Sequence, residues 1–519
     1  MEGRGGGGTS SGSGSGSDGG WEDVGAREDV DWVPLDPAWE RALSPGDGSL
    51  EAVRALLADE GVDPNGADGD GWTPLMRASM AGNVDTVDVL LACGRVDANG
   101  VGGPGNGGKT AVWHAAEEGQ NEAVRLLAAS PRVDVNARDR EGKTPLWVAS
   151  AWGYADAVAA LLGATGRVEV DVPDAIRGRT PLWKASERGR IEVVGMLLED
   201  GGADVNAADA RGQTPLWAAS HWGREGVVRT LVAFPGVDVE RANEDGATPL
   251  HAAVHENQVA CVRALLAASA DPTRPDDAGN GPLRTAASRG YATVVQLLLE
   301  DGRCDVNQRN AGGWTPLHGA ADFGHSHVAR LLLAAPGIDV NAVDEEYGVT
   351  PLWAAADVEN VGIVQLLLGD TRTDPNVADR EDGRTALCNA AHEGYTEVVS
   401  ALLEDPRVDV DVEDAGGTSP LLHASEQCNA GMVRALLGAG ASAIPRATGA
   451  SALERSAAGR GGIEACEQAV RAAVGPVLLA LVSAGMPMQV ASDLAIAALP
   501  DEVRETHALL LREQWRRRP

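Results

Sequence analysis

The stretch most suggestive of chemistry is Gly103 to Thr110, GPGNGGKT, which satisfies the phosphate-loop pattern GxxxxGK[ST]. In a nucleotide-binding enzyme, the backbone amides of such a loop surround the phosphates, and its lysine, here Lys109, reaches the terminal ones. A phosphate loop follows a buried apolar strand, whereas the preceding residues, GRVDANGV, are polar and typical of a turn. We therefore expect a glycine-rich insertion here, and a nucleotide-binding enzyme built on this loop stays an alternative.

The histidines suggest a second kind of chemistry, metal binding. His251 and His255 are four residues apart, the spacing that places two zinc ligands on one face of a helix. The segment HAAVH lacks the general-base glutamate and a third ligand. His325 and His327 likewise have no acidic or cysteine partner close in the sequence, and no Ser/His/Asp arrangement appears at a recognisable spacing. The sequence thus predicts no enzyme, no metal site and no cofactor.

The element that positions these residues is a repeated unit, most complete from Thr315 to Asn341, TPLHGAADFGHSHVARLLLAAPGIDVN. Thr315 can cap a helix, and Pro316 suits its first position, where a missing N–H costs nothing. Gly324 supplies the left-handed residue that ends this helix. Leu332 belongs to the apolar stripe of a second helix, and neither helix can bury its stripe alone.

The unit recurs every 32 to 37 residues. Its first residues are Thr73, Thr110, Thr144, Thr180, Thr214, Thr248, Gly281, Thr315, Thr350, Thr385, Ser419 and, weakly, Ser451. The segments TPLHAAV at Thr248, TPLWAAS at Thr214, DVNARDREGKTPLW at Asp134 and VVQLLLEDGRCDVN at Val294 resemble ankyrin repeats. The resemblance covers about Leu35 to Met486. It implies an all-α solenoid of about 12 helix-loop-helix units with β-turn or hairpin tips, whose usual work is binding other proteins.

Three regions are expected. Residues 1–34 form a Gly/Ser-rich and acidic tail that cannot offset its ordering entropy, residues 35–486 form the ankyrin array, and residues 487–519 form a C-terminal helical cap. Within the cap, LPDEV from Leu499 to Val503 resembles the opening of an F-box. A substrate-recognition adaptor of a ubiquitin ligase, acting through the C-terminal helices, is therefore a second alternative.

Charge and cysteine content narrow the function. The formal net charge is −33 and the pI is about 4.6, which opposes binding to nucleic acid or to an anionic membrane. The six cysteines show no CxxC and no metal-ligand spacing, and the N-terminus has no apolar signal segment. We therefore expect a monomeric, reduced intracellular protein in the cytoplasm, with the nucleus left open.

The tryptophans fall at two positions of the repeat. Trp113, Trp147, Trp183, Trp217 and Trp353 lie three residues after the first residue of their repeat, in place of the histidine of TPLH, and we expect them to be wedged between adjacent repeats. Trp152, Trp222 and Phe323 lie eight residues after it. In ankyrin repeats that position is the exposed end of the first helix and lines the concave groove.

These aromatics suggest where a protein partner binds. Near them, in the groove or on the hairpin tips, we expect Trp72, Arg177, Arg179, Arg188, His221, Arg289 and Trp314. Aromatic and arginine side chains are the preferred anchors of protein interfaces. The sequence therefore predicts a non-catalytic scaffold that binds a protein through its groove and hairpin tips. The alternative is that these aromatics only cover their own hairpins.

Some repeats depart from the pattern. The loop glycine is replaced by Asn257, Glu359 and Cys428, of which only asparagine tolerates the left-handed conformation well. Gly281 stands where the capping threonine would be. These departures predict locally irregular stacking.

Overall fold

The computed structural model describes residues 37–43, 50–68, 70–101, 104–164, 166–426 and 429–441. Within these ranges the chain forms 24 α-helices and, apart from an isolated bridge at Ala67, no strand. None of the described helices is long and apolar enough to cross a membrane. The expected acidic tail, the repeat at Ser451 and the C-terminal cap with LPDEV lie outside the described residues.

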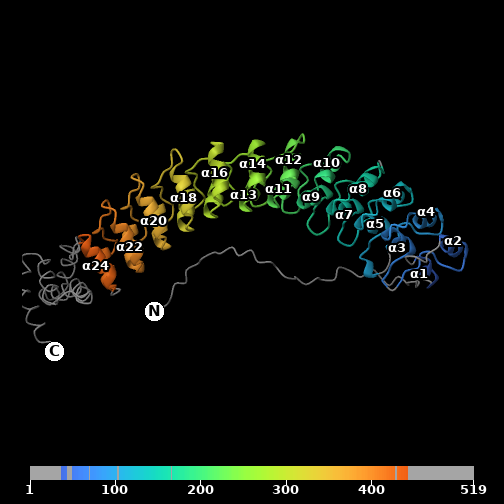
Figure 1. The fold of residues 1–519 in the computed structure, drawn as a ribbon, viewed down its shortest axis with the longest axis horizontal. Helices are drawn as coiled ribbons and strands as arrows, with labels where there is room; N and C mark the ends of the chain where they lie inside the picture. The colour runs from blue at the N-terminus through green and yellow to red at the C-terminus, as the bar shows by residue number, and fades with distance from the viewer. Residues whose placement is uncertain are drawn as a thin grey trace, which may run out of the picture.

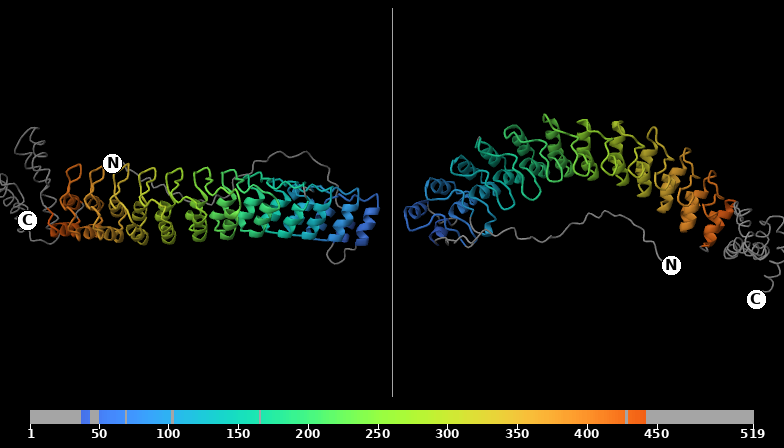
Figure 2. Two further views of the ribbon diagram at one scale, coloured as in Figure 1. Left: turned by 90° about the horizontal axis from the view of Figure 1, so that it is seen from above. Right: turned by 180° about the vertical axis from the view of Figure 1, so that it is seen from behind.

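The helices form 12 successive pairs that stack into one curved, elongated solenoid (Figure 1). The first helices of the pairs line the concave side: α1 (Pro37–Leu43), α3 (Pro74–Met80), α5 (Ala111–Glu117), α7 (Pro145–Trp152), α9 (Pro181–Arg188), α11 (Pro215–His221), α13 (Pro249–His255), α15 (Pro282–Ser288), α17 (Pro316–Asp322), α19 (Pro351–Asp357), α21 (Ala386–Glu393) and α23 (Pro420–Glu426). The second helices lie on the convex side: α2 (Leu50–Ala58), α4 (Val84–Ala92), α6 (Asn121–Ala129), α8 (Ala155–Leu162), α10 (Ile191–Glu199), α12 (Glu225–Ala233), α14 (Val259–Ala267), α16 (Ala292–Asp301), α18 (Ser326–Leu333), α20 (Val361–Leu368), α22 (Thr396–Leu403) and α24 (Ala430–Gly438). The loops between repeats project along one edge (Figure 2). The all-α solenoid predicted from the sequence is confirmed.

Local sequence sets the helix ends as expected. The Thr315 hydroxyl accepts the backbone N–H of His318, Pro316 occupies the first position of α17, and Gly324 has a φ of 78°. Asn257 and Glu359 also take the left-handed conformation, with φ of 55° and 57°. The helices around Glu359 pack as in the other repeats, whereas α13 and α15, which flank the junction between the Asn257 and Gly281 repeats, pack less extensively than the inner helices of the neighbouring repeats. The irregular stacking predicted from the sequence is therefore observed at that junction and not at Glu359, and Cys428 lies outside the described residues. The backbone conformation of the repeat is kept even where the side chain disfavours it.

The core is a continuous row of apolar side chains between the two helix layers, and each repeat packs only on its neighbours. Leu317 of α17 and Val328 and Leu332 of α18 are almost completely buried. Because no repeat closes a core by itself, the groove surface is positioned by nearest-neighbour stacking alone.

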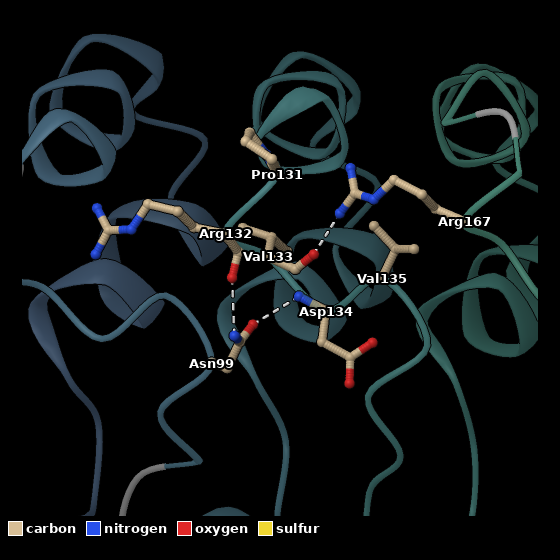
Figure 3. Close-up of a pocket in the computed structure, with 7 residues that line it drawn as sticks. All are labelled: Asn99, Pro131, Arg132, Val133, Asp134, Val135 and Arg167. Carbon is tan, nitrogen blue, oxygen red and sulfur yellow. Dashed lines mark hydrogen bonds between the residues drawn. The ribbon is translucent and has the colours of Figure 1, made fainter. Parts of the chain in front are cut away.

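A ladder of asparagine side chains joins the loops of successive repeats. Asn99, for example, accepts the N–H of Asp134 (2.7 Å) and donates to the carbonyl of Arg132 (2.8 Å) (Figure 3). The same pair of bonds is made by Asn65, Asn136, Asn206, Asn307, Asn341 and Asn376. At Asp171 and Glu240 the ladder changes, because each carboxylate only accepts, from the N–H of Asp204 and of Asp271.

A hollow of about 320 Å³ lies beside this ladder, lined by Asn99, Pro131, Arg132, Val133, Asp134, Val135 and Arg167 (Figure 3). Its polar groups are already engaged, because Asn99 bonds to the next repeat and Arg167 donates to the carbonyl of Val133. We assign it a structural role in joining repeats.

Candidate functional site

The residues three positions after the start of each repeat belong to the first helices, which line the concave side, and we refer to them as the floor of the groove. Trp113, Trp147 and Trp183 are buried there. Their indole N–H groups, and that of Trp353, donate to a carbonyl of the next repeat, namely Lys143 O (3.2 Å), Arg179 O (2.8 Å), Gln213 O (2.9 Å) and Arg384 O (3.2 Å). His251 and His318 make the equivalent contact through Nε2, with Asn280 O and Val349 O. These side chains hold repeats together, and no metal role is needed to explain His251.

Trp217 is an exception to this arrangement. It is half-buried, and its Nε1–H is buried without a hydrogen-bond partner. Its ring instead stacks on His221, with centroids 5.0 Å apart and an interplanar angle of 15°. Trp217 thus differs from the other four tryptophans in making no hydrogen bond to the next repeat. Trp353 is also half-buried, but it keeps its bond to the next repeat.

The residue before the repeat adds a contact to each of the three buried tryptophans. Lys109, Lys143 and Arg179 place their cationic groups 3.8, 5.1 and 4.0 Å from the ring centroids of Trp113, Trp147 and Trp183. Such cation–π contacts hold the indole flat on the floor of the groove. Gln213 stands before Thr214, so Trp217 has no cation above it.

Above the floor, three exposed side chains form a row across successive repeats. Trp152 ends α7, Arg188 ends α9 and Trp222 follows α11, each eight residues after the start of its repeat. Trp152 is 53% exposed, Trp222 is 50% exposed, and the Arg188 side chain is 54% exposed. We refer to these three residues as the aromatic–cation row. Phe323 (60% exposed) has the equivalent position three repeats beyond Trp222.

The charge at the centre of this row is positive, whereas the exposed Glu118 and Glu256 hold the equivalent position in the repeats on either side. Glu187, only 12% exposed, bonds to Lys184 and lies 3.5 Å from Arg179. Arg188 approaches the same carboxylate only to 3.7 Å, so its guanidinium remains largely in solvent. Desolvation by burial lowers the pKa of Lys184 and Arg179. Arg224 adds a further cation at the edge, because its Nε donates to the Glu187 carbonyl. A chain with a net charge of −33 thus carries a locally cationic, aromatic surface.

The other predicted site residues lie at various distances along the groove. His221 lies between Trp217 and Trp222, and burial lowers its pKa. Arg177 is exposed on a hairpin tip, and Arg289 contacts His255. Trp72 and Trp314 are half-buried, with ring centroids 4.2 Å from His114 and 5.4 Å from His318. Arg179 and Arg188 both approach the Glu187 carboxylate, and His221 contacts Trp222. Trp152 belongs to the repeat before Arg188, whereas Trp72, Arg289, Trp314 and Phe323 lie in other repeats.

Comparison with known proteins identifies the family. The family model for ankyrin repeats (3 copies) matches residues 41–139, 96–174, 132–209, 166–243, 202–276, 270–344 and 352–447. The chain belongs to the ankyrin-repeat family. Ankyrin repeats generally mediate protein–protein interactions, and proteins of this family are generally non-enzymatic scaffolds.

Individual relatives share only part of this ankyrin array. The chain is 36% identical over 116 residues to the ankyrin repeat and KH domain-containing protein mask-1 of Caenorhabditis elegans, covering 22% of this chain and 4% of that protein. It is 32% identical over 133 residues to the ankyrin repeat, SAM and basic leucine zipper domain-containing protein 1 of Ornithorhynchus anatinus, covering 25% and 26%. Among solved structures, the ankyrin repeat domain of Bcl-3 is 33% identical with a TM-score of 0.38, covering 41% of this chain and 93% of that one. The chain thus spans about a quarter or less of the curated relatives it matches.

Lys109, the lysine of the glycine-rich loop, belongs to the floor of this ankyrin groove. Its Nζ lies over Trp113 and 3.2 Å from the carboxylate of Glu117. A single 3₁₀ turn, Pro104–Asn106, precedes it, and the Asn106 side chain donates to its carbonyl. Thr110 stands at the start of α5, although its hydroxyl caps no N–H. These contacts direct the lysine away from the loop that would have to surround a phosphate.

Several groove residues were missed by sequence reasoning, among them Lys143, Lys184 and the Trp217–His221 pair. Lys143 is the residue before Thr144, and Lys184 follows Thr180 by four positions. When the ankyrin repeats are aligned on their first residue, Lys143 and Lys184 each occupy a defined position of the repeat. This alignment is the sequence signal that could have identified them.

Proposed function

We propose that this ankyrin array is a non-catalytic scaffold that binds a protein partner in its concave groove, anchored on the aromatic–cation row. The observation that carries the proposal is that Trp152 and Trp222 leave about half of their surface in water on either side of Arg188. Large exposed aromatics on a soluble surface mark interaction sites, and tryptophan and arginine are the residues most enriched among binding hot spots.

The spacing of the row suggests the form of the bound segment. Packed helices are about 8–10 Å apart, and an extended chain advances about 3.3 Å per residue. An extended peptide that crosses the inner helices therefore meets a new repeat about every third residue. The row fits a polyproline-II-like segment, which has three residues per turn, with an acidic side chain for Arg188 and an apolar side chain about three residues away on each side, for Trp152 and Trp222.

The surroundings support an acidic partner segment over a basic one. Arg188 has its guanidinium in solvent, and Lys184 and Arg179 already compensate the Glu187 carboxylate beneath it. The exposed Arg177 and Ile176 on the adjacent hairpin tip extend the surface with the same mixed chemistry. Because the chain as a whole is acidic, this local cationic surface also disfavours binding of an acidic segment elsewhere on the array.

A crosslinking experiment tests this proposal. A photoreactive amino acid is placed at position 188 in the groove or, as a control, at position 229 on the convex helix α12, where Arg229 is exposed. After irradiation in extract from the native source, we expect one reproducible adduct from position 188 only. The adduct should be lost in the folded Trp152→Ala/Trp222→Ala double variant. Adducts from position 229 alone, or adducts insensitive to the double variant, would contradict groove binding.

A further inference from the structure

A second cluster of reactive side chains lies near the other end of the described array, between the repeats that begin at Thr385 and Ser419. Cys388 Sγ, a ring nitrogen of His423 and a carboxylate oxygen of Asp414 all lie within 4.8 Å of one another. Cys388 and His423 are buried, and the Asp414 side chain is only 6% exposed. Within the part of the chain that the structure describes, no other group of three His, Cys, Asp or Glu side chains is as closely gathered.

A fourth donor stands beside these three. His392 lies one helical turn after Cys388 on α21, and its Nδ1 is 3.3 Å from Nδ1 of His423 on α23. Asp414 contacts the other ring nitrogen of His423, Nε2, and one ion cannot bind both nitrogens of an imidazole, so His392 reaches the shared ion only by rotating its side chain. The His392 side chain is 41% exposed, so it can turn toward the other donors without disturbing the core.

The repeat architecture explains why these donors meet only here. The position of Cys388 is the one that tryptophan or histidine fills in most other repeats, and its Sγ points at the Thr418 carbonyl (3.8 Å) as those side chains do. A thiol is smaller than an indole, so it leaves room beside it. Asp414 uses one carboxylate oxygen to accept the Thr418 N–H (2.8 Å) and turns the other to His423 (2.9 Å).

We propose that Cys388, Asp414 and His423, with His392 as the fourth ligand, bind a zinc-class divalent cation that joins the last two described repeats. One thiolate, imidazole nitrogens and a carboxylate form a donor set that suits such a cation, and four protein ligands give the closed coordination of a structural site. On binding, the Cys388 S–H proton is released to solvent and the sulfur–metal bond replaces it. The cation would link α21, α23 and the hairpin between them.

One neighbouring group competes with the cation. Arg384 Nε lies 3.8 Å from the Asp414 carboxylate, and Arg384 also pairs with the exposed Asp382 (3.2 Å). Because the guanidinium already has this second, exposed partner, it can move away from Asp414 when a metal ion arrives. Arg384→Gln should therefore tighten metal binding, whereas a purely structural cluster would show no gain.

Cobalt(II) is the probe, because a thiolate–cobalt bond gives a charge-transfer absorption that reports sulfur coordination. The reduced full-length chain, freed of metal with a chelator, is titrated with Co²⁺ and then with Zn²⁺. We expect the absorption to saturate at one equivalent of Co²⁺ and to disappear as Zn²⁺ displaces it. Absence of the band, or a band that Zn²⁺ leaves unchanged, would overturn the proposal.

Matched variants assign the ligands. Cys388→Ser should abolish the band, whereas Cys304→Ser, which changes another thiol that lies apart from this cluster, should leave it intact. His392→Ala, at a half-exposed position, should keep the fold and weaken Co²⁺ binding by more than about tenfold. A band that survives in Cys388→Ser, or one lost in Cys304→Ser, would overturn the site. Unchanged Co²⁺ affinity in His392→Ala would overturn the assignment of His392 as the fourth ligand. Circular dichroism of each variant confirms that the repeats are folded.

Discussion

The ring of Trp217 lies nearly parallel to that of His221, one helical turn further along α11, with centroids 5.0 Å apart. This contact replaces the bond to the next repeat that Trp113, Trp147 and Trp183 make. His221 in turn meets the edge of Trp222, at 5.2 Å between centroids. A residue from the floor of the groove is thereby joined to the exposed aromatic–cation row.

The first prediction separates tryptophans of the floor by their contacts. Trp183→Ala removes a buried indole together with its bond to Gln213 and should cost about 3–5 kcal/mol of unfolding free energy. Trp217→Ala removes a half-buried ring whose N–H has no partner and should cost roughly 1–2 kcal/mol less. Urea unfolding followed by circular dichroism measures both. Equal losses would show that Trp217 is as firmly wedged as its counterparts.

The second prediction concerns the aromatic–cation row. Trp152→Ala and Trp222→Ala should each change the melting temperature little, because both side chains are half-exposed and lie outside the repeat interfaces. Each should weaken partner binding by more than about 1 kcal/mol, and Arg188→Glu should weaken it further by repelling an acidic segment. Titration calorimetry with the crosslinked partner measures this, with Arg229→Ala on the convex face as control. Variants that melt early but bind normally would assign the row to stability.

The fold was predictable because its determinants are local. The Thr–Pro start, the left-handed glycine and the apolar stripe lie within one repeat, and eleven further copies of the pattern confirm each other in the sequence. Exposure of Trp152 and Trp222 followed from the same counting. The conformation at Glu359 was predicted less well, because the packing of both helices overrides the preference of one residue.

The sites were less predictable, because they depend on neighbours in other repeats. Trp217 stacks on His221 in place of a bond to the next repeat, a contact that no single-residue propensity contains. Cys388, Asp414 and His423 are far apart in sequence, so a search for metal-ligand spacing along the chain passes over them. Stacking brings them together because each holds a different position of neighbouring repeats.

The third prediction is a pH dependence from His318. Burial lowers its pKa in the folded state from 6.5 to about 4. Below pH 6.5 the unfolded chain therefore binds a proton at His318 that the folded chain does not bind. Stability that is present at neutral pH is consequently lost as the pH falls toward 4. The pKa difference sets an upper bound of about 3 kcal/mol on this loss of unfolding free energy, at 1.36 kcal/mol per pKa unit.

The comparison that isolates this effect uses His318→Trp, because tryptophan fills the same position in other repeats and does not titrate. Urea midpoints at pH 7 and pH 5 should differ less for this variant than for the parent chain. His327→Gln, at an exposed position, should retain the parental pH dependence. If His318→Trp and the parent lose stability equally on acidification, other groups carry the effect.

The fourth prediction follows from the left-handed backbone at Glu359. Glycine adopts a φ of 57° without a steric penalty, so Glu359→Gly should stabilise the chain by roughly 0.5–1 kcal/mol despite the greater freedom of its unfolded state. Asn257→Gly should gain less, because asparagine already tolerates this region. Thermal melts of both variants provide the measurement. A larger gain at Asn257 would contradict the strain argument.

The fifth prediction repairs the asparagine ladder. Asp171 accepts the Asp204 N–H (3.0 Å), but its carboxylate cannot donate to the carbonyl that an asparagine would reach, and burial raises its pKa. Asp171→Asn should add that donor and stabilise the chain by roughly 0.5–1.5 kcal/mol. The reverse change one repeat earlier, Asn136→Asp, should remove the bond to the Arg167 carbonyl and destabilise. In urea unfolding the two variants should change the unfolding free energy in opposite directions. A change in the same direction would contradict a stabilising role of the asparagine ladder.

The interruption of the ladder at Asp171 also has a mechanical meaning. Each repeat holds only its neighbours, so a pulling force on the two ends is borne in series by every junction, including those at Asp171 and Glu240 where the ladder is interrupted. Asp171 joins the two repeats that carry Trp152 and Arg188. A protein segment lying across the aromatic–cation row would act as a splint over the Asp171 junction, so that occupancy of the groove would raise the tension that this part of the array can carry.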